Sequence, residues 1–127
     1  MKLTRFEDID AWQEARKLVR YVYKAISINK NFQKDPRLTN QIQASSVSTM
    51  ANIAEGFFRK THKEFIQYLF ISKGSAAEVQ SHLYVALDQG YITQEVFKET
   101  YEQAEKVKKI IAGFIKYLNS QPKQTPN

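Results

Sequence analysis

Apolar residues recur every three or four positions along most of the chain, which is the spacing of amphipathic helices. The first of these stripes predicts a helix over Asp10–Ser27, with Asp8 or Asp10 as its cap. A polar segment, INKNFQKDP, then separates this helix from the next one. The stripe consists of Ile9, Trp12, Ala15, Val19, Val22 and Ile26.

Cap residues place the second and third helices. Asp35 and Pro36 predict the start of the second helix, because aspartate caps helix N-termini and proline is tolerated in the first turn. This helix is expected to end near Gly56. The sequence THKE, at residues 61–64, has the form of a capping box and predicts the start of a third helix, which Gly90 is placed to end.

The fourth helix is expected to begin at Thr93 and to reach Leu118. Because short turns join the last three helices, neighbouring helices must run antiparallel. The sequence therefore predicts an all-α fold, an antiparallel up-down-up-down four-helix bundle over residues 1–119. Residues 120–127, SQPKQTPN, are polar and broken by proline, and we expect a flexible polar tail there.

The third predicted helix carries a second apolar row besides its core stripe. A helix on the surface of a monomer needs only one apolar face, so the second row predicts central burial or contact with a partner subunit. We expect an oligomer of identical chains, the commonest kind of soluble assembly. Its interface is expected to contain Ile66, Phe70, Ala77 and Tyr84. The alternative is that these side chains enlarge the core of a single chain.

The composition is that of one basic domain. The chain has 127 residues, no cysteine and a formal net charge of +6. The absence of cysteine excludes disulfides, thiolate metal sites and cysteine nucleophiles. The segment MKLTRFEDID has no apolar run that could serve as a signal peptide, and no eighteen apolar residues run together, so we expect a cytoplasmic protein that does not contact a membrane. A positive domain attracts nucleic-acid phosphates and other anionic surfaces.

Motifs for catalysis and metal binding are missing. Glu78 and His82 are four residues apart, whereas the di-iron bundle pattern needs Glu-x-x-His spacing twice. Gly74 and Ser75 lack the strand-turn-helix context of a nucleophile elbow, and no glycine-rich phosphate loop occurs. We therefore expect no enzymatic activity, no cofactor and no metal ion.

One face of the second predicted helix is small and polar. Small side chains allow a neighbouring helix to come close, and Asn52 and Glu55 are spaced to share hydrogen bonds. One interpretation is that this face sets the register of helix or subunit packing, as a buried Asn does in coiled coils. The other is a polar pocket with Glu55 as a ligand group. The face consists of Ser45, Ser48, Ala51, Asn52 and Glu55.

Positive charge gathers in two clusters. A charge run is usually a solvated helix face, but an oligomer repeats each cluster around its axis and strengthens the field that a polyanion meets. The basic ridge on the first helix consists of Arg16, Lys17, Arg20 and Lys24. The basic knot between the second and third helices consists of Arg59, Lys60, His62 and Lys63.

The segment SVSTMANIAEGFFR resembles a family signature, Ser-x-x-x-Asn-Ile-Ala-Glu-Gly-x-x-Arg. It is typical of bacterial four-helix-bundle proteins found in intervening sequences of 23S ribosomal RNA genes, which are also called S23 ribosomal-protein-like. Further agreement lies in AWQEA, KEF, GSAAE and GYI, so the resemblance covers nearly the whole chain except the tail. The matching positions are Ser48, Asn52, Ile53, Ala54, Glu55, Gly56 and Arg59.

The resemblance implies a homopentamer with no enzymatic activity and an association with nucleic acid. The fold is similar to that of retroelement accessory variability proteins, which are basic pentamers that bind nucleic acid and a reverse transcriptase. The family often has arginine where this chain has Ala44, which moves the expected contacts to other cations. The expected nucleic-acid contacts are Arg59, Lys60, Lys63, Arg16, Lys17 and Arg20. The residues expected to serve helix packing are Ser48, Asn52, Glu55, Gly56 and Gly74.

Three functional hypotheses follow. The first is a homo-oligomeric bundle that binds RNA or DNA through its basic clusters without base specificity. The second is a protein–protein interaction scaffold, in which the aromatic surface binds an unidentified protein and the charge has no nucleic-acid role. The third is an enzyme that uses the region around Glu55.

Overall fold

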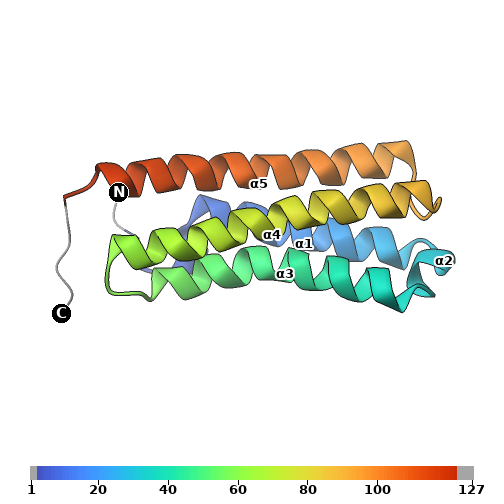
Figure 1. The fold of residues 1–127 in the computed structure, drawn as a ribbon, viewed down its shortest axis with the longest axis horizontal. Helices are drawn as coiled ribbons and strands as arrows, with labels where there is room; N and C mark the ends of the chain where they lie inside the picture. The colour runs from blue at the N-terminus through green and yellow to red at the C-terminus, as the bar shows by residue number, and fades with distance from the viewer. Residues whose placement is uncertain (1–2, 123–127) are drawn as a thin grey trace.

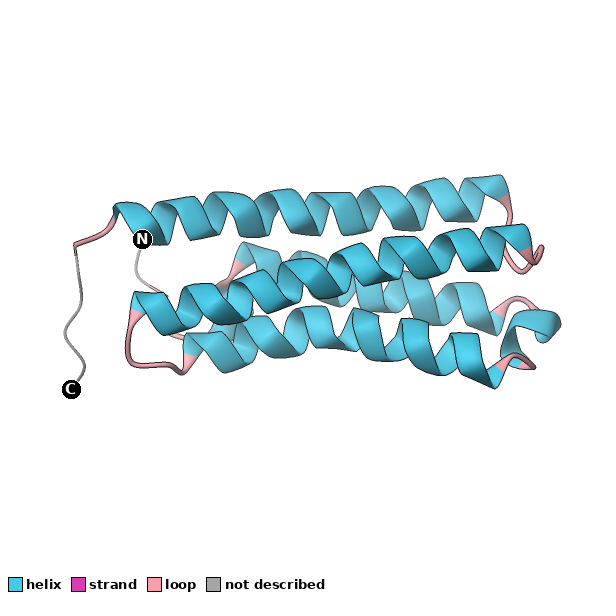
Figure 2. Cartoon of the chain, viewed as in Figure 1, coloured by secondary structure: helices cyan, strands magenta, loops and turns pink. Residues whose placement is uncertain are grey.

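The computed structural model describes residues 3–122, and all regular structure in that part of the chain is helical (Figure 2). The bundle and its antiparallel order are confirmed. Four long helices form it: α1 Asp10–Ser27, α3 Pro36–Phe57, α4 His62–Asp88 and α5 Gln94–Ser120. Two short elements accompany them: the 3-10 turn η1 Phe6–Asp8 and the single-turn helix α2 Lys30–Gln33.

Each of the four long helices packs against two others, so the four are arranged as a square. α3 packs against α1 and α4, and α5 packs against α4 and α1. Consequently α1 and α3 form one side of the bundle, and α4 and α5 form the opposite side. One end carries α2 and the α4–α5 connection, and the other end carries η1 and the α3–α4 connection (Figure 1).

The predicted caps hold for three of the four long helices. The side chains of Asp35, Thr61 and Thr93 each accept a hydrogen bond from the backbone amide three residues later. The prediction for α1 was wrong, because Ile9 occupies its N-cap position and no side-chain hydrogen bond caps the helix. Asp8 belongs to η1 and accepts from the Thr4 hydroxyl instead.

Gly90 ends α4, as the sequence predicted. Its φ of +73° lies in the left-handed region that favours glycine. The Gly90 amide donates to the Leu87 carbonyl at 3.0 Å, and the Tyr91 amide donates to the Ala86 carbonyl at 2.9 Å. These two bonds are the Schellman pattern, which satisfies carbonyls at the end of a helix.

The polar segment between α1 and α3 contains a core residue that the sequence analysis missed. Phe32, in α2, is fully buried, and its ring stacks on Tyr91 with 5.3 Å between the centroids. The Asn29 side chain caps α2 by accepting from the Phe32 amide at 2.8 Å. The Tyr91 hydroxyl donates to Asp35 Oδ2 at 2.9 Å. The two connections at this end of the bundle are therefore docked against each other.

The predicted apolar stripe of the first helix contributes Ile9, Ala15, Val22 and Ile26 to the core. In α1, however, Leu18 is fully buried while Val19 is only partly buried, so the buried face is turned toward Leu18. The last helix extends to Ser120, the first residue of the expected tail. Residues 123–127 of that tail lie outside the described residues.

Candidate functional site

The α3–α4 connection brings the basic knot to one end of the bundle. Arg59 Nη2 donates to Glu55 Oε1 and, at 2.7 Å, to the Tyr68 hydroxyl. The Arg59 guanidinium also lies over the Tyr68 ring, 4.6 Å from its centroid, in a cation–π contact. Arg59 is therefore held by its own chain, and its charge is largely balanced by Glu55.

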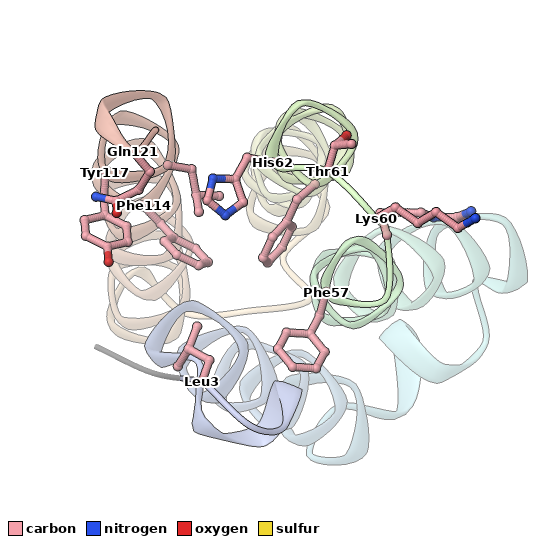
Figure 3. Close-up of a pocket in the computed structure, with 11 residues that line it drawn as sticks. Leu3, Phe57, Lys60, Thr61, His62, Phe114, Tyr117 and Gln121 are labelled. Carbon is pink, nitrogen blue, oxygen red and sulfur yellow. The ribbon is translucent and has the colours of Figure 1, made fainter. Parts of the chain in front are cut away.

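The other members of the knot point in different directions. Lys60 and Lys63 are exposed. Lys60 extends away from the bundle axis, whereas His62 points into the end of the bundle (Figure 3). The knot therefore does not form one continuous cationic surface.

The small polar face of α3 connects this helix to α4. The hydroxyls of Ser48 and Ser75 share a hydrogen bond of 2.9 Å between the two helices. Asn52 Nδ2 donates to the Ser48 hydroxyl, also at 2.9 Å. The sequence spacing predicted hydrogen bonding between Asn52 and Glu55. In the structure Glu55 is exposed and bound to Arg59. These contacts favour the helix-packing interpretation over a polar pocket around Glu55.

The two glycines expected to serve helix packing differ. Gly56 is buried, and a β-carbon there would lie 2.8 Å from Phe65 Cδ1 and 2.8 Å from Tyr68 Cβ. Gly74 is exposed on α4, and a β-carbon there would meet nothing within 4 Å. Within one chain, only Gly56 is required for close approach of α3 and α4.

The basic ridge lies on the outer surface of α1. Arg16, Arg20 and Lys24 are exposed there. Lys17 is partly buried, and its ammonium lies 5.6 Å from the centroid of the Tyr21 ring. The ion pairs found within residues 3–122 involve other cations. Arg16, Arg20 and Lys24 thus form no ion pair within the described residues, whereas the Lys17 charge helps to lower the pKa of Glu14.

The outer face of α4 is apolar where the second row was predicted. Phe70 is 56% exposed and Tyr84 is 50% exposed, while Ile66 is partly buried. The Tyr84 ring also packs edge-on against Phe97 of α5. Ile71 and Val85 are two further exposed apolar residues of α4 that do not fall on the predicted row. The outer face of α4 comprises Ile66, Phe70, Ile71, Ala77, Tyr84 and Val85.

A pocket of about 430 Å³ opens at the end of the bundle that carries the knot (Figure 3). Phe57, Phe65 and Phe114 supply aromatic walls from three helices, and His62 and Gln121 are polar members of its lining. This pocket could not be predicted from the sequence, because segments far apart in the sequence form it. Within residues 3–122, no group of three or more His, Asp or Glu side chains is placed to hold a metal ion.

Two glutamates with shifted pKa values take part in contacts between helices. A hydrogen bond from Gln103 of α5 is the main cause that lowers the pKa of Glu14 in α1. A hydrogen bond from Gln80 of α4, followed by one from Lys108, lowers the pKa of Glu105 in α5. Both hydrogen bonds therefore favour the ionised carboxylate, and each connects α5 to a neighbouring helix.

Comparison with known proteins identifies the family. Residues 7–113 match the family described as 23S rRNA-intervening sequence protein. This chain belongs to that family. No curated protein matches the chain.

The fold of this 23S rRNA-intervening sequence family member is also found in a solved structure. That crystal structure is of a protein with unknown function from the S23 ribosomal protein family of Bacteroides thetaiotaomicron. The two chains are 25% identical with a TM-score of 0.75, over 84% of this chain and 98% of the other. Within residues 3–122, no helix is both long and apolar enough to cross a membrane.

Family membership gives the signature around α3 a physical meaning. Among the matched positions, Ser48 and Asn52 connect α3 to α4, Gly56 permits their close approach, and Arg59 binds Glu55 and Tyr68. In this member of the 23S rRNA-intervening sequence family, the signature therefore stabilises the α3–α4 hairpin.

Proposed function

We propose that this protein is a non-enzymatic, homo-oligomeric helical bundle that binds RNA or DNA through phosphate contacts. The observation that carries this proposal is the basic ridge, whose exposed cations lie outside the ion pairs of the described residues. Phosphate binding draws on cations whose charge is not already neutralised, and it carries no base specificity by itself.

The proposed contact residues differ in how far neighbouring side chains already bind them. Arg16, Lys17 and Arg20 of the ridge contribute most, because none of them forms an ion pair within residues 3–122. Lys60 and Lys63 contribute from the knot. Arg59 contributes least, because Glu55 and Tyr68 already bind its guanidinium.

The oligomer of this proposal forms through the outer face of α4. Exposed apolar patches usually mark interaction sites, and Phe70 and Tyr84 are each at least half exposed in the single chain. Identical chains are the commonest partners, and the family resemblance implies a pentamer. Assembly also repeats the ridge around one axis, which strengthens binding to a long polyanion.

A fluorescence titration tests the proposed function directly. The purified protein is mixed with labelled RNA and DNA duplexes of the same sequence at low and at high salt. We expect binding at low salt that weakens steeply as salt rises, because released counterions drive phosphate contacts. Undetectable binding at low salt, or affinity independent of salt, would rule the nucleic-acid function out.

A protein–protein scaffold is the second candidate, and the aromatic surface favours it. Phe58 is 71% exposed at the end of α3, in addition to the outer face of α4. An apolar surface of this kind suits a protein partner. In that case a charge-neutralised ridge leaves the function intact, whereas Phe58→Ala and Phe70→Ala impair it.

A further inference from the structure

We propose that the phosphate-binding surface is the α1–α3 side of the bundle, extending from the ridge across α2 to the first turn of α3. This inference rests on the proposed function and names the site for it. Residues 15–54 contain seven Lys and Arg residues but a single acidic residue, Asp35. The seven cations, here called the basic side, are Arg16, Lys17, Arg20, Lys24, Lys30, Lys34 and Arg37.

The one carboxylate in this segment is turned toward the protein. Asp35 Oδ1 accepts from the Leu38 amide at 3.1 Å, and Asp35 Oδ2 accepts from the Tyr91 hydroxyl at 2.9 Å. Asp35 therefore caps α3 and joins the two connections. It forms no ion pair with a cation of the described residues.

Exposure and pairing separate the basic side from two cations of α5. Six of its seven members are exposed, and Lys17 is partly buried. By contrast, Lys106 and Lys108 of α5 pair with Glu14 and Glu105 at 3.2 and 3.3 Å. The charge of the basic side is thus available to an external anion.

One part of the opposite side of the bundle is acidic. Residues 78–105, in the second half of α4 and the first half of α5, contain six acidic residues and one Lys or Arg, Lys98. Because α1 packs against α3 and α5 but lies diagonally across from α4, this acidic segment lies largely opposite the basic side. The resulting field attracts a polyanion to the α1–α3 side and repels it from the acidic segment. The acidic residues are Glu78, Asp88, Glu95, Glu99, Glu102 and Glu105.

The spacing of the cations suits a nucleic-acid backbone. Arg16, Arg20 and Lys24 are four residues apart on α1, so successive members are separated by about 6 Å along the helix axis. Lys30 and Lys34 follow α1 in the chain, at the end of the bundle that carries α2 (Figure 1). A duplex carries one charge per ~1.7 Å of its axis, so a row with this wider spacing can contact several phosphates without reading the bases. The ligand of this surface is therefore the phosphate backbone of a duplex.

Two variants with equal charge changes test this surface. The first neutralises its α2 end, with Lys30→Gln, Lys34→Gln and Arg37→Gln. The control neutralises three cations of α5 that belong neither to the basic side nor to the knot, with Lys98→Gln, Lys109→Gln and Lys116→Gln. All six side chains are exposed, so circular dichroism should show unchanged helix content in both variants. Binding is measured with an RNA duplex, a DNA duplex of the same sequence, and the single DNA strand.

We expect the first variant to bind both duplexes at least about tenfold more weakly, and its salt slope to fall by about 3. The control should lose less than about threefold, because its cations lie outside the basic side. If wild-type protein binds but the control loses as much as the first variant, the site assignment is wrong and the proposed function stands. A preference for the single strand over both duplexes would also overturn the assignment. If wild-type protein binds none of the three probes, the proposed function fails together with the site.

Discussion

Gly56 of α3 faces Tyr68 of α4 so closely that a β-carbon on the glycine would lie 2.8 Å from Tyr68 Cβ. The same β-carbon would lie 2.8 Å from Phe65 Cδ1. The Tyr68 β-carbon is attached directly to the backbone of α4, so it cannot move aside without moving the helix. The glycine therefore sets the distance between the two helices at this end of the bundle.

Replacing this glycine should strain the hairpin. Gly56→Ala is expected to lower the free energy of unfolding by about 1–3 kcal/mol, because extra volume in a packed site forces the helices apart. Gly113→Ala is the control, since a β-carbon at that helical position meets nothing within 4 Å. Urea denaturation should show the control unchanged or more stable by up to about 1 kcal/mol. Equal stability of Gly56→Ala and Gly113→Ala would contradict the close approach of α3 and α4 at Gly56.

The hydrogen bond between Ser48 and Ser75 should couple α3 to α4. A double-mutant cycle with Ser48→Ala and Ser75→Ala is expected to show a coupling free energy of about 1 kcal/mol. The cycle cancels the helix propensity that each alanine adds on its own. A second cycle with Ser48→Ala and Ser81→Ala serves as the control, because Ser81 is exposed on α4. Its coupling should be near zero, and a similar value in both cycles would argue against a direct contact.

The outer face of α4 predicts a change in assembly. Phe70→Glu places a charge in the proposed contact between copies, so light scattering should show a smaller molar mass than wild type at the same concentration. The fold should remain, because Phe70 is already 56% exposed in the single chain. Val47→Glu, at a half-exposed apolar residue of α3, is the matched control and should assemble normally. A wild-type protein that is monomeric would refute the proposed oligomer.

The hydrogen bond between Tyr91 and Asp35 predicts a pH dependence of stability. That bond raises the pKa of Tyr91 above its usual value of 10.0. The fold therefore favours the neutral phenol, so its stabilising contribution is complete below about pH 10 and is lost as pH rises through the folded-state pKa. Tyr91→Phe should remove this loss from unfolding curves measured at alkaline pH, whereas Tyr117→Phe should retain it. Identical alkaline profiles for wild type and Tyr91→Phe would disprove the linkage.

Much of the fold could be predicted from the sequence because its signals are local. Asp35 and Thr61 act within three residues of their own position, and Gly90 needs only its own backbone conformation. The first cap failed because η1 runs directly into α1 and leaves Ile9 at the cap position. Phe32 was missed because a single aromatic residue in a polar segment has no periodicity to detect.

The candidate site was harder to predict because its contacts join distant positions. Arg59 could be recognised as a cation, but its partner Tyr68 lies across the α3–α4 connection. The partner of Ser48 is 27 residues away on α4. Exposed side chains on α1 could be predicted from the helical spacing, since positions four apart share a face. Which of those cations lack a carboxylate neighbour required the packed structure.

The burial of Phe32 has a consequence for the cations on either side of it. A short connection between helices normally samples many conformations, and fixing each backbone residue costs roughly 1–2 kcal/mol. Because Phe32 anchors α2 to Tyr91, that entropy is lost during folding and not during association. Lys30 and Lys34 are thus presented on a preorganised support, and an incoming polymer meets charges whose backbone positions are already set.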